Sequence, residues 1–209
     1  AAAGSNTLVL PTNNGSANQI LQTDGSGNLS WVDKPSSAQV THSSVTALSG
    51  TNEKEWTLTG NVKKIDVNIY KASHNGGSGG STNTYFAFLL GDSGGYAGSN
   101  CYDNVNMRLS AADSNASTVS QSRLAWCYFG DAHDNNLSGY ASFRLVGTDS
   151  GNDYWVYDFK GADDNNDDLY LGTGFCNSGI SGLSKIKFFT YNNAHNFDMG
   201  HVSITYWTA

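Results

Sequence analysis

The sequence predicts an all-β protein, with a jelly-roll-like antiparallel β-sandwich head over residues 53–209 preceded by a short β-hairpin. Aromatic residues make up 12% of the chain and charged residues only 14%, and Gly, Ser, Asn and Thr are abundant. Few helix formers, many turn formers and many aromatic residues favour strands. Short stretches of alternating apolar and polar residues recur about ten times after residue 53, and none has a helical period. Such regular spacing is typical of a sandwich or jelly roll.

Each expected strand is bounded by Gly, Asn, Asp or Ser turns. The expected strands cover residues 56–58, 65–69, 85–90, 105–109, 124–129, 140–146, 154–159, 169–171, 186–191 and 202–207. The run at 85–90 is continuously apolar and ends in the glycine turn 91–95, which predicts a buried strand followed by a tight turn.

The turn sequence GDSGG at 91–95 is also the nucleophile motif of trypsin-like serine proteases. His42, Asp66 and Ser93 occur in the chain order of that family's triad. However, the residue after the motif is Tyr96 where those proteases carry proline, and about ninety residues before the serine cannot supply the barrel that the fold needs. We therefore interpret the motif as a turn.

Residues 1–35 differ from the rest and predict a separate segment. They hold two small apolar patches, and the turn at 24–28 is followed by Leu29 and Trp31 alternating with polar residues, which indicates a hairpin. These apolar groups are too few to form a core of their own. Either the head or other copies of the chain must therefore cover them. Residues 36–52 are rich in Ser and Thr and are expected to be a linker. Because the chain opens without methionine, we expect it to be a piece of a longer protein.

The stretch GSANQILQTDGSGNLSW at 15–31 resembles a segment that recurs in bacteriophage tail fibres and related virion proteins. The matching positions are Gly15, Gln19, Leu21, Thr23, Asp24, Gly25, Gly27, Leu29 and Trp31. The resemblance covers about a tenth of the chain. It implies a shaft-like junction that leads into a distal head, usually in a homotrimer, and it implies no catalysis.

A second resemblance covers the head. The segments KIDVNIY at 64–70, FLLGDSGGY at 88–96 and IKFFTYNNAHNFDMGHVSITYW at 186–207 look like a module found in predicted structural proteins of marine phages. Its marks are a G-D-x-G-G-Y turn after a core strand and a closing F-D-x-G-x-x-x-I-x-Y strand. The matching positions are Gly91, Asp92, Gly94, Gly95 and Tyr96, then Phe197, Asp198, Gly200, Ile204 and Tyr206. The resemblance does not indicate what the module binds.

The charge and the cysteines limit the classes of partner. A net charge of −7 argues against a nucleic-acid surface, which needs clustered Lys and Arg. No apolar run is long enough to span a membrane, so we expect no membrane insertion. Cys101, Cys127 and Cys176 are odd in number and irregularly spaced, which favours free thiols over a disulfide framework or a metal site.

The sharpest acidic cluster lies at 163–168, where Asp163, Asp164, Asp167 and Asp168 make calcium a possible cofactor. An EF-hand loop would need glycine in place of Asp168 and glutamate in place of Gly174. The favoured interpretation is a solvated loop between two strands, and no cofactor is expected otherwise.

The sequence offers no pair of residues that indicates catalysis. The only glutamates, Glu53 and Glu55, alternate with Trp56 and are expected on the solvent face of a strand. The five histidines are scattered, without the H-x-H spacing of axial metal sites in fibre tips. We therefore expect no enzyme, although an aspartate pair for glycan cleavage stays open.

Recognition is the remaining chemistry. Sugar-binding surfaces combine an aromatic face with Asn, Asp and backbone donors, and three predicted loops have this composition. The candidate receptor-binding residues in them are Tyr96, Asn100, Tyr102, His133, Asp134, Asn135, Tyr191, Asn192 and His195.

Together these observations predict a surface-exposed virion protein. We expect the distal head of a tail fibre or appendage, homotrimeric, in contact with other virion proteins and with a host cell-surface glycan or protein. A capsid decoration or head-fibre protein without a receptor is the alternative, and a glycan depolymerase is a third.

Overall fold

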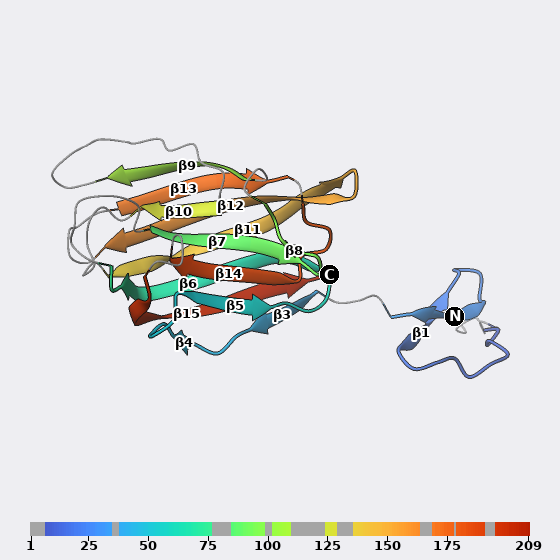
Figure 1. The fold of residues 1–209 in the computed structure, drawn as a ribbon. Helices are drawn as coiled ribbons and strands as arrows, with labels where there is room; N and C mark the ends of the chain where they lie inside the picture. Colours follow the sequence, from blue (N-terminus) through green and yellow to red (C-terminus); the bar gives the residue numbers. More distant parts are fainter. Residues whose placement is uncertain are drawn as a thin grey trace, which may run out of the picture. The chain divides into compact units, whose positions relative to one another are not determined.

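The computed structural model describes residues 7–34, 38–76, 85–98, 102–109, 124–128, 136–163, 169–177, 179–190 and 195–209, and all of its regular elements are β-strands (Figure 1). For residues 85, 102–109 and 124–128 only the main chain is described. The chain divides into two compact units, residues 1–37 and residues 38–209.

Unit 1 contains the expected hairpin. Strands β1 (Gln19–Thr23) and β2 (Leu29–Asp33) pair antiparallel, with Leu21 opposite Trp31. Val9 adds a parallel bridge to Asn28, so a third segment of chain lies along the turn.

The turn of this hairpin is held by its own polar groups. Thr23 Oγ1 accepts the N–H of Gly25 at 3.1 Å, and Asp24 accepts the N–H of Ser26 at 2.7 Å. The amide side chain of Asn28 donates to the other oxygen of Asp24 at 2.6 Å, and these bonds, with the Asn28 bond the largest cause, lower the pKa of Asp24. The T-D-G sequence therefore folds the turn locally, as Asp and Thr side chains commonly do.

A close contact explains the glycine that opens the motif. Gly15 has φ +70°, and a Cβ atom on it would lie 2.6 Å from the ring of Trp31. Only glycine allows both that conformation and that approach. The indole N–H of Trp31 donates to the carbonyl of Asn13 at 2.9 Å, which fixes the ring against this turn.

Unit 2 is a sandwich of two sheets. The large sheet has the order β3-β15-β6-β11-β12-β13-β9, with β4 also paired to β15. Its strands are β3 (Gln39–His42), β4 (Thr46–Ala47), β6 (Val62–His74), β9 (Tyr102–Leu109), β11 (Leu137–Asp149), β12 (Asn152–Asp163), β13 (Leu169–Cys176) and β15 (Phe197–Thr208). Every described pairing in it is antiparallel.

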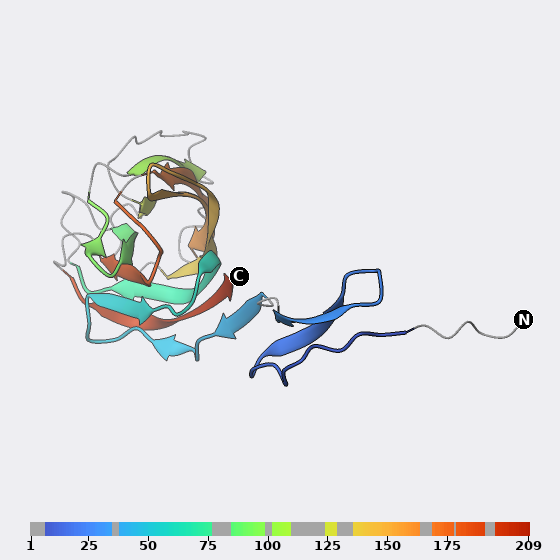
Figure 2. The ribbon, with the colours of Figure 1, turned by 90° about the vertical axis from the view of Figure 1, so that its right-hand side faces the viewer.

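The small sheet has the order β10-β7-β14-β5, with β8 paired to β7. Its strands are β5 (Glu53–Thr57), β7 (Tyr85–Asp92), β8 (Gly95–Tyr96), β10 (Leu124–Tyr128) and β14 (Lys185–Thr190). Figure 2 shows the large sheet bending around the small one. The prediction of an all-β antiparallel sandwich is confirmed.

Strands that are consecutive in the chain pair with strands that are also consecutive, in reverse order. In the large sheet β6 pairs with β15. In the small sheet β7, which follows β6 in the chain, pairs with β14, which precedes β15. A two-stranded ribbon thus passes from one sheet to the other, as in a jelly roll. Between these strands the chain adds the consecutive antiparallel meander β11-β12-β13.

The core consists of aromatic and branched side chains from both sheets. Phe86 and Phe88 of β7 and Phe188 of β14 face Phe143 of β11 and Phe197 of β15, and all five are essentially buried. The rings of Phe88 and Phe143 are 5.3 Å apart and those of Phe86 and Phe197 are 5.4 Å apart. Burying each such side chain contributes about 1.5–3 kcal/mol, so this layer holds the two sheets together.

The structure corrects the expected linker at 36–52. Strands β3 and β4 within it pair with β15, and Leu48 is buried in the core. The sequence pattern misses β3 because all four of its residues are exposed, so they show no alternation. This edge strand pairs through its main chain, and the His42 ring adds a contact with the Thr205 hydroxyl at 2.9 Å.

Candidate functional site

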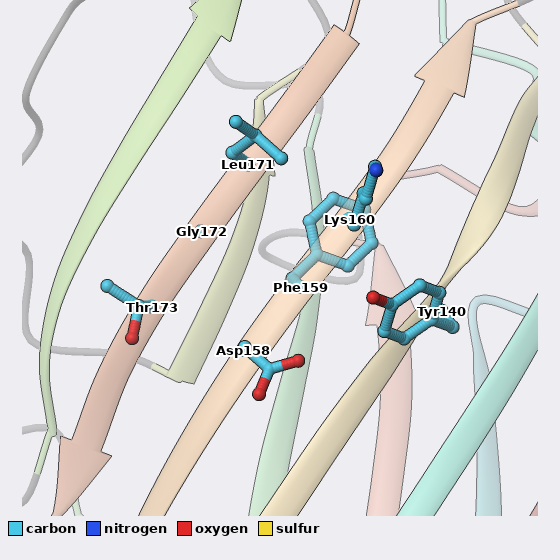
Figure 3. Close-up of a pocket in the computed structure, with 7 residues that line it drawn as sticks. All are labelled: Tyr140, Asp158, Phe159, Lys160, Leu171, Gly172 and Thr173. Atoms are coloured by element: carbon cyan, nitrogen blue, oxygen red, sulfur yellow. The ribbon is translucent and has the colours of Figure 1, made fainter.

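A hollow of about 330 Å³ lies on the large sheet, on the face turned away from the small sheet. Figure 3 shows its lining, which comes from the adjacent strands β11, β12 and β13. The lining residues are Tyr140, Asp158, Phe159, Lys160, Leu171, Gly172 and Thr173.

Strand register brings the outward side chains of the hollow together. Tyr140 of β11 is paired with Lys160 of β12, which is paired with Leu171 of β13, and in the next row Asp158 is paired with Thr173. These five residues are exposed, whereas the residues between them point into the core. This is the alternation of a sheet with one buried face.

The polar groups of the hollow are open to a ligand. The ion pairs of the described residues join Lys64 to Asp66 and Lys187 to Glu53, so neither involves Asp158 or Lys160. The Thr173 hydroxyl donates to the carbonyl of Tyr157 at 3.1 Å and can still accept a hydrogen bond. The hollow therefore offers an aromatic face, a carboxylate acceptor and an ammonium donor within one surface.

The neighbouring strands carry a polar network that is satisfied internally. The Ser142 hydroxyl donates to Asp66 at 2.7 Å, and Asp66 also accepts the ammonium of Lys64 at 2.6 Å. The same ammonium lies 4.2 Å from the ring centroid of Trp207. Ser142 is the register partner of Asp158, so this network borders the hollow.

Of the expected receptor-binding residues, Tyr96 lies in a charged cluster on the outer face of the small sheet. Its hydroxyl donates to the carboxylate of Glu55, and its ring has the ammonium groups of Lys185 and Lys187 at 4.9 and 4.6 Å. Burial, and then the hydrogen bond to Glu55, raises the pKa of Tyr96. Lys187 also pairs with Glu53 at 2.9 Å, so both glutamates lie on the outer face, as their alternation predicts.

His195 lies elsewhere in the head, in a histidine stack. Its ring is parallel to that of His74, with centroids 5.4 Å apart, and His74 is buried against Phe86. The carbonyl of His195 accepts the Thr190 hydroxyl at 2.6 Å. His195 and Tyr96 thus have separate sets of contacts.

The other residues of the expected receptor-binding loops are not described at the side-chain level. Tyr102 begins β9, of which only the main chain is described. Asn100, His133, Asp134, Asn135, Tyr191 and Asn192 lie outside the described residues. The expectation that these loops bind a receptor stays a prediction.

The possible calcium ligands are only partly within the described residues. Asp163 is the last residue of β12 and is buried, while Asp164, Asp167 and Asp168 lie outside the described part. Among the residues that are described, no group of three or more His, Cys, Asp and Glu side chains is arranged to hold a metal. Cys176 is buried in the core.

The GDSGG sequence forms a structural turn between β7 and β8. The Asp92 carboxylate accepts the N–H of Gly94 at 2.7 Å and that of Ser181 at 3.0 Å, and these bonds, the Ser181 bond first, lower the pKa of Asp92. His42 instead faces Thr205 at 2.9 Å on the large sheet. The turn thus joins β8 to the segment before β14.

Local sequence patterns do not single out the residues of the hollow. Tyr140, Asp158 and Lys160 lie at outward positions of two strands that the sequence does predict, and an exposed Tyr beside an exposed Lys gives no signal by itself. Only the register between β11, β12 and β13 brings them together.

No family model, curated protein or solved structure matches the chain. No helix long and apolar enough to cross a membrane occurs in the part of the chain that the structure describes.

Proposed function

We propose that this chain is the distal part of a phage tail fibre or a similar virion appendage, and that its head attaches the particle to a glycan on the host cell surface. The observation that supports the attachment is the hollow of Tyr140, Asp158, Lys160, Leu171 and Thr173. A pyranose ring has C–H patches that pack on a tyrosine face and hydroxyls that bond to a carboxylate, an ammonium group and a threonine. A concave site with an aromatic wall and a few polar groups fits such a ligand.

Unit 1 supports the assignment to a fibre. In the segment that resembles tail-fibre proteins, Thr23, Asp24 and Trp31 bond within the unit. Its apolar residues remain outside: Leu10 is 66% exposed and Ile20 is 44% exposed. Side chains of this kind need a cover, and two further copies of the segment would supply it in a homotrimer. Three heads would then bind a repeating surface glycan with high avidity from weak single sites.

Two other functions fit parts of the same description. A capsid decoration or head fibre would use the same folds without a receptor and would be located on the virion in contact with other virion proteins. A depolymerase would need a pair of carboxylates across a cleft. Among the residues that the structure describes, the hollow has one carboxylate, Asp158, beside a cation and an aromatic face, and this combination favours attachment over both.

The test is binding of the full chain to a panel of bacterial surface polysaccharides and arrayed glycans. We expect the chain to bind at least one of these glycans. Tyr140→Ala should lower the affinity about tenfold, which corresponds to about 1.4 kcal/mol of binding free energy. Tyr140→Phe keeps the ring and should retain binding. Asp158→Asn should also weaken binding, whereas Asp149→Asn, an exposed carboxylate in the turn of the same hairpin, is the matched control.

Absence of binding to any glycan, or binding that none of the Tyr140 and Asp158 variants changes, would contradict attachment through this hollow. Release of new reducing ends from a bound polysaccharide would favour the depolymerase. Multi-angle light scattering of the same preparation tests the homotrimer, and a mass of one chain would contradict it.

A further inference from the structure

We infer that the ligand of the hollow is a linear oligosaccharide that crosses the strands of the large sheet, with a second stacking subsite on Tyr70. This inference rests on the proposed function, since it assumes that the hollow binds a glycan. It adds a contact residue outside the hollow and a direction for the bound oligosaccharide, and it requires a ligand longer than one sugar ring.

The second subsite follows from the register between β6 and β11. Tyr140 is paired with Asn68, and Tyr70 is the next outward-facing residue of β6 after Asn68. Tyr70 is therefore a diagonal neighbour of Tyr140, and such residues lie about 7–8 Å apart, with a somewhat shorter distance between their Cβ atoms. The two tyrosines are 59% and 43% exposed, and both lie on the outer face of the sheet.

The main chain holds Tyr70 in this position. Directly after it, Lys71 has φ +50°, and its N–H donates to the hydroxyl of Ser138 on β11 at 3.1 Å. The ammonium of Lys71 lies 5.9 Å from the ring centroid of Tyr70. The strand thus changes its path immediately beyond the ring, which leaves Tyr70 as the last outward side chain of the regular part of β6.

The hollow and Tyr70 belong to a band of exposed side chains that continues on both sides of them. His201 of β15 is the register partner of Tyr70 and is exposed, while Leu171 and Thr173 of β13 close the opposite end. The band therefore crosses the five adjacent strands β13, β12, β11, β6 and β15. With strands about 4.8 Å apart, this is about 19 Å, which is longer than one sugar ring.

The chemistry of the band changes along its length in a way that suits a chain of sugars. The hollow supplies a carboxylate and an ammonium group for hydroxyls, and Tyr140 and Tyr70 then supply two successive apolar faces. Aromatic rings contribute to such contacts at low entropic cost because they have few rotatable bonds. A monosaccharide in the hollow cannot reach Tyr70, so only longer ligands would gain from it.

The experiment measures the affinity of the full chain for linear oligosaccharides from monosaccharide to hexasaccharide in the chito-, cello-, laminari- and alginate series. In the series that binds, affinity should rise with length. Tyr140→Ala should weaken binding of every length about tenfold. Tyr70→Ala should weaken binding of the longer members about tenfold and leave the monosaccharide unchanged, and Tyr70→Phe should restore full affinity. Thermal unfolding verifies that each variant is folded.

The outcomes separate this inference from the function on which it rests. If no member of any series and no surface polysaccharide binds, the proposed function fails and the inference with it. If binding occurs but reaches full strength at the monosaccharide, or if Tyr70→Ala affects all lengths equally or none, the proposed function stands and the second subsite is wrong. A change in molar mass in Tyr70→Ala would make Tyr70 a contact between copies of the chain and would also overturn the inference.

Discussion

The two units of the chain reach an ordered structure by different means. In unit 1, none of the described residues is buried, and the hairpin is held by hydrogen bonds of Asp24, Thr23 and Trp31 and by the contact of Gly15 with the indole ring. In unit 2, a continuous core of buried aromatic and branched residues joins two sheets.

This difference between the units shows that the interactions that select a conformation are not the same as those that supply the free energy of folding. Hydrogen bonds that form in exchange for bonds to water contribute little net free energy, but they determine which conformation a short segment adopts. Burial of apolar surface supplies most of the free energy of folding. Unit 2 has both contributions, whereas the described residues of unit 1 have a well-defined turn and no buried core.

The largest expected effect is in the core of unit 2. Phe88 is fully buried and its ring lies 4.9 Å from that of Phe188. Phe88→Ala should reduce the free energy of unfolding by about 3–5 kcal/mol because it leaves a cavity between the sheets. Denaturant unfolding measures this loss. Val146→Ala, at an exposed position, is the control and should stay within about 0.5 kcal/mol of the wild type.

The second prediction applies to unit 1. Gly15→Ala places a methyl group against Trp31 in a left-handed backbone conformation, which should destabilise the hairpin locally by about 1–3 kcal/mol. Hydrogen exchange should become at least about fivefold faster in unit 1 only, while the melting temperature of unit 2 stays unchanged. Ser16→Ala leaves the contact intact and serves as the control. Protection lost in both units would contradict the separation described above.

A smaller effect is expected at the turn that links β8 to the segment before β14. The pKa of Asp92 is lowered, so its contribution to stability is complete above the unfolded pKa, about 3.9, and is lost as the pH falls through the lower folded pKa. Asp92→Asn should lower the melting temperature at pH 7 by about 2–4 °C.

The difference between Asp92→Asn and the wild type should shrink as the pH falls from the unfolded pKa, about 3.9, through the lower folded pKa of Asp92, since the carboxyl group is then protonated and neutral. A difference that stays constant with pH would show that the carboxylate charge does not contribute. Asp149→Asn, in an exposed hairpin turn, is the control for the loss of one negative charge.

The smallest effect should come from the ion pair on the outer face of the small sheet. Lys187 and Glu53 are partly exposed, so their coupling energy should be about 0.2–1 kcal/mol. A double-mutant cycle with Lys187→Met and Glu53→Gln measures it, and the coupling should weaken in high salt. A value above about 2 kcal/mol would mean that surface charge contributes to the stability of unit 2 on a par with a core side chain.

Local sequence patterns are enough to predict the hairpin of unit 1 and most of the strands of unit 2. Each of the ten expected segments of the head overlaps a strand, and the turn at 24–28 joins β1 to β2. Alternation is a local property that survives in any antiparallel sandwich, and the Asp24 turn is closed by bonds between residues at most four positions apart. The exposed strand β3 was missed for the same reason, because an edge strand without alternation has no local signature.

Which strands are neighbours, and in what register, depends on the tertiary fold. Tyr140, Lys160 and Leu171 form one row, and Tyr70 stands diagonal to it, because β6, β11, β12 and β13 align in this register and no other. A shift of one residue in any of these pairings would turn the side chains of that strand to the opposite face. The core fixes the register through residues such as Phe143 and Tyr157, which are paired with each other and buried on the face opposite the hollow. The surface pattern therefore follows from packing that the local sequence does not encode.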